Sequence, residues 1–143
     1  MFAVAVNADG SLELIDVPRP RPGAYEAVVR TQVGYLCNGT DSDIIAGELP
    51  EVAGYPALFG HENAGTIVEV GEKARSYKVG DRVAGTLLLE TTDDRYATGF
   101  GGFCEFTIAT DFASMLEDGV IEDTPGRDIV FKIMRPVPAD IPI

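Results

Sequence analysis

Residues 55–71 read Tyr-Pro-Ala-Leu-Phe-Gly-His-Glu-Asn-Ala-Gly-Thr-Ile-Val-Glu-Val-Gly, and the fold is organised around this stretch. Its second half, residues 64–70, is rich in apolar and β-branched residues and ends at Gly71, which is typical of a buried strand. The only histidine of the chain, His61, stands just before that strand, between Gly60 and Glu62. The stretch therefore predicts a candidate metal ligand at the start of a buried strand.

Short strand-like runs recur on both sides of this stretch, between Gly, Pro, Asn and Asp residues. The run at 27–36 leads directly to Cys37, and residues 38–47 then predict a short helix that ends at its last glycine, with Thr40 or Ser42 as a cap-type residue near its start. Many short strands with tight turns indicate a mainly β fold, a partly open barrel with one or two short helices. The other expected strands cover residues 2–6, 12–17, 64–70, 81–89, 103–109 and 129–134, with surface excursions at 90–102 and 111–127.

The composition excludes several classes of protein. The 143 residues are enough for one domain with a buried core. There are 23 acidic and 11 basic residues, giving a net charge of −12, whereas nucleic-acid binding depends on clustered Lys and Arg. No apolar run approaches the roughly 18 residues that a membrane span needs. With no disulfide framework and no signal-peptide pattern, we expect a cytoplasmic protein that binds neither nucleic acids nor membranes.

Three side chains offer the ligand types that zinc accepts: the thiolate of Cys37, the imidazole of His61 and the carboxylate of Glu62. A catalytic zinc site uses three such ligands and keeps one position open for water or substrate. Residue types alone leave other interpretations open, because a single Cys is often a small buried apolar residue and a single His a hydrogen-bonded core residue. We expect the second cysteine, Cys104, to lie in the core.

Three motifs carry a resemblance to a known family: G-H-E-x-x-G at 60–65, K-x-G-D-R-V at 78–83 and G-G-F-C-E-F-T-I at 101–108. Together they resemble the zinc-dependent medium-chain alcohol and polyol dehydrogenases, over about residues 34–109. The set is specific although each motif alone is weak. The resemblance implies the N-terminal GroES-like catalytic domain of that family, a partly open β-barrel.

The resemblance also implies a role for each matching residue. Cys37 and His61 would be ligands of a catalytic Zn²⁺, and Glu62 would be a third ligand or a carboxylate that exchanges with water on the metal. Thr40 would relay the proton of the alcohol, and Asp41 would hydrogen-bond the ligating imidazole. Two alternatives stay open, namely that Asp41 is an ordinary first-turn helix carboxylate and that Glu62 is a solvated residue at a strand end.

The sequence departs from the family between the cysteine and the threonine. Two residues separate Cys37 from Thr40, whereas most of the family has one. Gly39 could absorb the additional residue in a bulge or tight turn. The proton-relay role of Thr40 is therefore less strongly implied than the ligand role of Cys37.

The resemblance covers only part of a dehydrogenase. No G-x-G-x-x-G follows a strand, so no Rossmann domain is expected in this chain, and NAD or NADP would bind only in a full-length protein. We expect a GroES-like domain at 1–135 and, at 136–143, an extended hinge toward a cofactor domain from which the chain has been separated by truncation. Such a fragment would be inactive alone on its alcohol, polyol or sugar substrate, and its zinc site could be empty.

Two other functions fit the same residues. The chain could be a free-standing GroES-like binding or oligomerisation module without catalysis, in which a surface elsewhere covered by the cofactor domain becomes a homo-oligomer or partner interface. A metal-independent reductase relative is a weaker possibility, since Cys37 and His61 argue against it.

Overall fold

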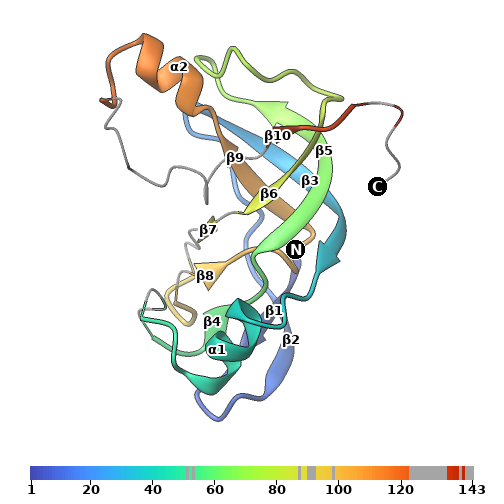
Figure 1. The fold of residues 1–143 in the computed structure, drawn as a ribbon, viewed down its shortest axis with the longest axis vertical. Coiled ribbons are helices and arrows are strands. Elements are labelled where there is room, and N and C mark those ends of the chain that lie inside the picture. Colours follow the sequence, from blue (N-terminus) through green and yellow to red (C-terminus); the bar gives the residue numbers. More distant parts are fainter. Residues whose placement is uncertain are drawn as a thin grey trace.

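The computed structural model describes residues 1–50, 52, 54–86, 88–89, 93–97, 99–122, 135–138 and 140. Within these residues it has three antiparallel sheets and two short helices (Figure 1). The five-stranded sheet, in the order β10-β6-β5-β3-β9, contains β3 (Glu26–Tyr35), β5 (Glu62–Val70), β6 (Arg82–Thr86), β9 (Phe106–Thr110) and β10 (Arg135–Pro136). The other elements are β1 (Phe2–Val6), β2 (Leu12–Asp16), α1 (Thr40–Ala46), β4 (Ala57–Leu58), β7 (Leu88–Leu89), β8 (Gly99–Phe100) and α2 (Phe112–Glu117).

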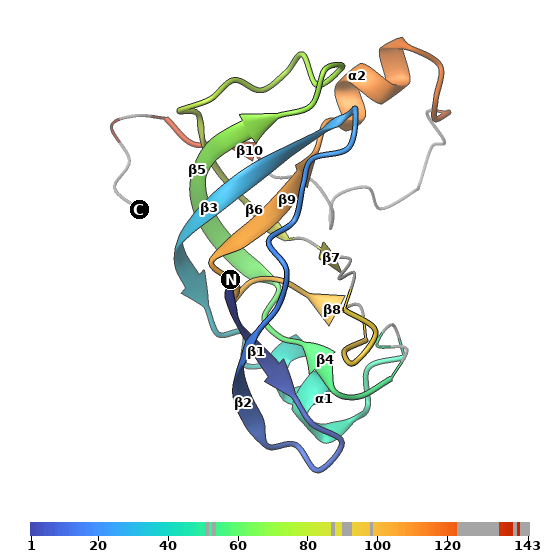
Figure 2. The ribbon, with the colours of Figure 1, turned by 180° about the vertical axis from the view of Figure 1, so that it is seen from behind.

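Among the described residues the sheets do not close into a single barrel, and the expected mainly β, partly open fold is confirmed. Strands β2, β1 and β4 form a three-stranded sheet, and β7 pairs with β8. In Figures 1 and 2 the three-stranded sheet and α1 lie at one end of the molecule, and α2 lies at the other. Strands β3 and β5 run between the two ends, so they connect the part that carries the candidate ligands to the rest of the core.

Strands β1 and β2 agree with the strands predicted at residues 2–6 and 12–17, and they pair as an N-terminal hairpin. Strands β1 and β2 pair with Ala3 opposite Ile15, and both side chains are buried. The turn between the strands ends at Gly10, which has φ +80, a left-handed conformation that glycine adopts without steric cost.

A small apolar cluster holds α1 against the three-stranded sheet. Ile44 of α1 packs with Val6, Ala57 and Phe59, and all four are buried. The hydroxyl of Tyr55 also donates a hydrogen bond to the carbonyl oxygen of Ile44 at 2.6 Å. The helix is therefore anchored to the same short segment, Tyr55 to Phe59, that leads into His61.

Some local predictions are confirmed and others are wrong. Gly47 caps the end of α1 in a left-handed conformation, as expected. The cap prediction at its start is wrong, because the N-cap is Gly39 and no side chain caps the helix. Gly102 was expected in a surface excursion, but it is buried. Its N–H donates a hydrogen bond to the carbonyl oxygen of Gly60 at 2.7 Å.

The segment after β9 also differs from the expected surface excursion. It begins with a second helix, α2, which was not predicted in this segment. The expected strand at 129–134 lies outside the described residues. Further on, β10 pairs with β6 at the edge of the sheet, with Pro136 opposite Val83, and an edge strand is where a sheet tolerates proline. None of the helices in the described ranges has the length and apolar character needed to cross a bilayer.

Asp111 fastens α2 to the loop before β6. It is 1% exposed, and its carboxylate accepts hydrogen bonds from the N–H and hydroxyl of Ser114 and from the N–H of Ser76. Burial by itself would raise the pKa of Asp111, but the hydrogen bonds from Ser114 and Ser76 outweigh burial and hold the pKa below its ordinary value. The ionised carboxylate is thus the form that stabilises this corner.

We expect Asp111→Ala to lower the free energy of unfolding at pH 7 by about 2 kcal/mol, the upper range for loss of a helix cap. Because the folded pKa lies below the unfolded value of about 3.9, this stabilisation is present above pH 4 and disappears as the pH falls through the folded pKa. Urea unfolding of both proteins at pH 7 and pH 3 measures the effect. The free energy of unfolding of Asp111→Asn, which keeps one acceptor oxygen, is expected to lie between those of the parent and Asp111→Ala. If the stability difference between the parent and Asp111→Ala grew from pH 7 to pH 3, the assignment would be contradicted.

Candidate metal centre

Cys37 lies between the end of β3 and the start of α1. The hydrogen bond from the N–H of Asp41 to the carbonyl oxygen of Cys37, at 3.2 Å, connects the cysteine to the first turn of the helix. Gly39 has φ −88, and apart from its chain neighbours no described residue has an atom within 4 Å of the position that a Cβ would occupy. Asn38 and Gly39 form a turn, which agrees with the expectation that this position absorbs the additional residue in a tight turn. The ψ angle of Gly39 is −84, which lies outside the usual helical range.

Asp41 connects two of the candidate ligands. One carboxylate oxygen accepts the N–H of Cys37 at 2.8 Å, and the other lies 2.9 Å from Nδ1 of His61. Asp41 is 1% exposed, and a buried carboxylate is costly unless it is hydrogen-bonded in this way. Asp41 thus sets both the backbone position of Cys37 and the orientation of the His61 ring.

The pairing with Asp41 decides which nitrogen of His61 can face a metal. Nδ1 is the atom next to the carboxylate, so it carries the hydrogen in the neutral ring. Nε2 lies on the other side of the ring, 3.8 Å from Oε1 of Glu62. The neutral imidazole therefore directs a lone pair toward Glu62, which is the arrangement of a metal-ligating histidine.

The turn before His61 depends on glycine. Gly60 has φ +81, and a Cβ there would lie 2.3 Å from Cδ2 of Phe103. Phe103 also packs on Phe59, with ring centroids 5.5 Å apart. The sequence identified Gly60 through its motif but not Phe103, whose apolar ring in a Gly-Gly-Phe run has no distinctive signal. Phe103 supports the segment that carries His61.

The structure brings Cys37, His61 and Glu62 together. Their candidate ligand atoms all lie within 4.8 Å of one another, and no other group of three His, Cys, Asp or Glu side chains with this property occurs among the described residues. Ligand atoms around a tetrahedral zinc lie roughly 3.5 Å apart, so small side-chain movements would complete the geometry. The sulfur, nitrogen and oxygen donors fit zinc.

The exposure of these side chains changes across the site. His61 is buried, Cys37 is partly buried, and the side chain of Glu62 is 49% exposed. The cluster therefore opens to solvent on the side of Glu62, which leaves room for a water molecule or a substrate. Thr40 begins α1 and is partly buried.

The second cysteine belongs to the core, as expected. Cys104 is 3% exposed and packs with Ala3, Ile15 and Leu58. Burial raises the pKa of its thiol to about 12. A thiol of this kind stays protonated at neutral pH, so it is a poor metal ligand.

Comparisons with known proteins agree with the fold and the motifs. The family model of the alcohol dehydrogenase GroES-like domain matches residues 23–117. A glucose 1-dehydrogenase from Methanocella arvoryzae is 41% identical over 88 residues, which cover 59% of this chain and 24% of that protein. A class-3 alcohol dehydrogenase from Cereibacter sphaeroides is 42% identical over 81 residues, 57% of this chain and 21% of that protein. The chain thus matches about a quarter or less of the length of these relatives.

A solved structure of similar fold extends over the whole chain. The crystal structure of galactitol-1-phosphate dehydrogenase from Escherichia coli has a TM-score of 0.68 at 22% identity, and the match covers 100% of this chain and 40% of that one. At this identity the likeness concerns the fold alone. The family model, by contrast, matches well over half of the sequence and includes both Cys37 and His61. The chain therefore belongs to the alcohol dehydrogenase GroES-like domain family.

Proposed function

We propose that this chain is the zinc-binding catalytic part of an NAD(P)-dependent dehydrogenase that acts on an alcohol, a polyol or a sugar. The observation that carries the proposal is the convergence of Cys37, His61 and Glu62 within 4.8 Å. Two relatives are a glucose 1-dehydrogenase and an alcohol dehydrogenase, which supports a substrate with a hydroxyl group. The fold alone would not support this, because one fold serves many reactions.

Each residue of the site has a role in this proposal. Cys37, His61 and Glu62 would hold the ion, with Glu62 able to exchange with water at the open side. Zinc, when bound, supplies the Lewis acidity that lowers the pKa of the substrate hydroxyl, and a nicotinamide on another domain supplies the hydride acceptor. Thr40, three positions after Cys37, would accept the hydroxyl proton and pass it to solvent. Asp41 would keep Nε2 of His61 directed at the ion.

The same proposal implies how the chain is divided into a domain and a connecting segment. Residues 1–135 would form the GroES-like domain, and 136–143 would lead toward a nicotinamide-binding domain. Hydride transfer needs the cofactor to be held over the substrate. The chain alone would therefore bind zinc without catalysing the reaction.

Zinc binding by the isolated chain tests the proposal. We expect about one zinc per chain, and we expect Asp41→Asn to weaken zinc binding roughly 10- to 100-fold, the usual cost of losing a group that orients a ligand. An asparagine replaces one carboxylate oxygen by an NH₂ donor, so it cannot keep the arrangement in which one oxygen accepts from Cys37 and the other from His61. The measurements are elemental analysis and competition with a chromophoric chelator.

Asp43→Asn provides a matched control, because Asp43 is an exposed acid in the same helical turn. This variant removes the same charge and is expected to bind zinc as the unmodified chain does. Equal losses in the two variants would indicate a general charge effect and contradict the role of Asp41. A zinc-free oligomer that chelator does not affect would favour a binding or oligomerisation module over a dehydrogenase.

A further inference from the structure

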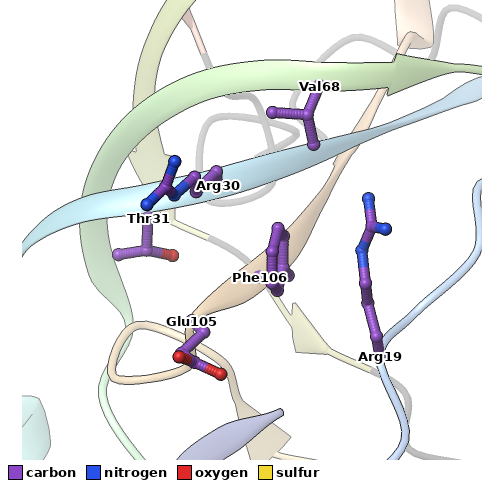
Figure 3. A pocket seen from close by; sticks show the side chains of 6 residues that line it. All are labelled: Arg19, Arg30, Thr31, Val68, Glu105 and Phe106. Carbon is purple, nitrogen blue, oxygen red and sulfur yellow. The ribbon is translucent and has the colours of Figure 1, made fainter.

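A pocket of about 460 Å³ lies on the face of the five-stranded sheet (Figure 3). It is lined by Arg30 and Thr31 of β3, Val68 of β5, Glu105 and Phe106 at the start of β9, and Arg19 from the segment between β2 and β3. In Figure 2 that segment runs alongside β9. The volume is within the range of small-molecule sites, about 300 to 1,000 Å³.

The pocket is separate from the candidate metal centre. Arg30 is followed by five more residues of β3 before the chain approaches Cys37. At about 3.3 Å per residue, roughly 16 Å of strand lies between them. A ligand in this pocket would therefore not touch the metal ligands.

Two arginines give the pocket its positive charge. In the view of Figure 3, Phe106 lies between Arg30 and Arg19. The guanidinium carbon of Arg19 lies 4.5 Å from the centroid of the Phe106 ring, and one of its nitrogens lies 3.5 Å from Glu69. Arg30 is exposed, and its guanidinium has no ion pair or hydrogen bond within the described part of the chain. An unpaired arginine is notable in a chain with 23 acidic and 11 basic residues.

Besides the two arginines, the pocket is lined by one acidic residue, Glu105, and by two apolar side chains that could contact an uncharged part of a ligand. Glu105 is held in place, because its carboxylate accepts the N–H of Phe2 at 2.7 Å. Phe106 and Val68 present apolar surface. The hydroxyl of Thr31 is shielded and has no hydrogen-bond partner among the residues that the structure describes.

We propose that this pocket binds a small organic carboxylate with an aromatic or similar apolar part. Arg19 and Arg30 against Glu105 leave one net positive charge, and Glu69 partly compensates Arg19. This balance suits a monoanion better than a phosphate dianion. A guanidinium binds a carboxylate through two parallel hydrogen bonds, and Phe106 offers a ring on which an apolar group can stack.

A titration of the metal-free chain, followed by NMR of its backbone amides, tests the proposal. Phenylacetate is the probe, benzyl alcohol the uncharged comparison and inorganic phosphate the simple-anion comparison. We expect saturable shifts at Arg30, Thr31 and Phe106 with phenylacetate, and at least tenfold weaker binding of the other two compounds. Shifts confined to Cys37 and His61, no saturation, or tighter binding of phosphate would overturn the proposal.

Variants separate a built site from a general charge effect. Arg30→Gln is expected to weaken phenylacetate binding at least tenfold, and Arg30→Lys less, since it keeps the charge but loses the paired hydrogen bonds. Arg21→Gln is the matched control, because Arg21 is exposed in the same segment as Arg19 but does not line the pocket. The affinity of the Arg21→Gln variant for phenylacetate is expected to stay within twofold of that of the unmodified chain. Equal effects of the Arg21 and Arg30 changes would contradict the assignment.

Discussion

Replacement of Cys37 by serine is expected to lower the affinity of the chain for zinc by more than about 100-fold. Loss of a group that merely orients a ligand costs 10- to 100-fold, so loss of a ligand costs more. The thiolate is also the soft donor of the set, and a serine hydroxyl does not ionise near neutral pH. Competition with a chromophoric chelator gives the two affinities, and elemental analysis gives the zinc content.

The second cysteine supplies the control for this experiment. Cys104→Ala removes a sulfur from the core, 3% exposed, and is expected to leave zinc binding unchanged. In a full-length form with a nicotinamide-binding domain, Cys37→Ser is expected to abolish reduction of NAD or NADP by an alcohol, a polyol or a sugar. Unchanged zinc affinity in Cys37→Ser, or an equal loss in Cys104→Ala, would refute Cys37 as a ligand.

The second large effect concerns folding. Gly65→Ala is expected to lower the free energy of unfolding by roughly 3 kcal/mol or more, at or beyond the upper range for overpacking. A Cβ at Gly65 would lie 2.2 Å from the carbonyl oxygen of Arg30 and 2.8 Å from Cγ1 of Val29. The first contact is with backbone in the middle of the β3–β5 pair, so no side-chain rotation can relieve it.

Gly39→Ala is the matched control for Gly65→Ala. Apart from its chain neighbours, no described residue lies within 4 Å of the Cβ position at Gly39, and its φ is −88. The free energy of unfolding of Gly39→Ala is expected to stay within about 0.5 kcal/mol of that of the parent, as for a typical surface change. Urea unfolding of the three proteins provides the comparison, and a Gly65→Ala chain as stable as the parent would show that β3 and β5 can separate without cost.

The sequence predicted correctly those elements of secondary structure that depend on residues close together in the chain. The hairpin at Gly10, the helix that ends at Gly47 and the long strand before Cys37 follow from patterns of a few neighbouring residues. The six-residue helix α2 was missed, because so short a helix leaves little periodicity. The single predicted strand at 81–89 corresponds to two elements, β6 and β7, which pair with different partners.

For the candidate metal centre, the sequence predicted which residues could be ligands but not how they lie relative to one another. A resemblance suggested Cys37, His61 and Glu62, but their approach within 4.8 Å depends on how β3, α1 and β5 pack. The link from Asp41 to the N–H of Cys37 is likewise a tertiary contact that no local pattern signals. Arg19 lies over the ring of Phe106, a strand residue 87 positions away, and no local pattern signals this contact either.

The bond between Asp41 and His61 affects how related sequences are interpreted. His61 satisfies a buried carboxylate at 2.9 Å, so this pair could persist in a protein that had lost its metal. No such constraint acts on the sulfur of Cys37, which makes no hydrogen bond to any described residue. On the proposed zinc site, we therefore expect the cysteine, rather than the more conspicuous histidine, to be the better marker of metal binding among related sequences.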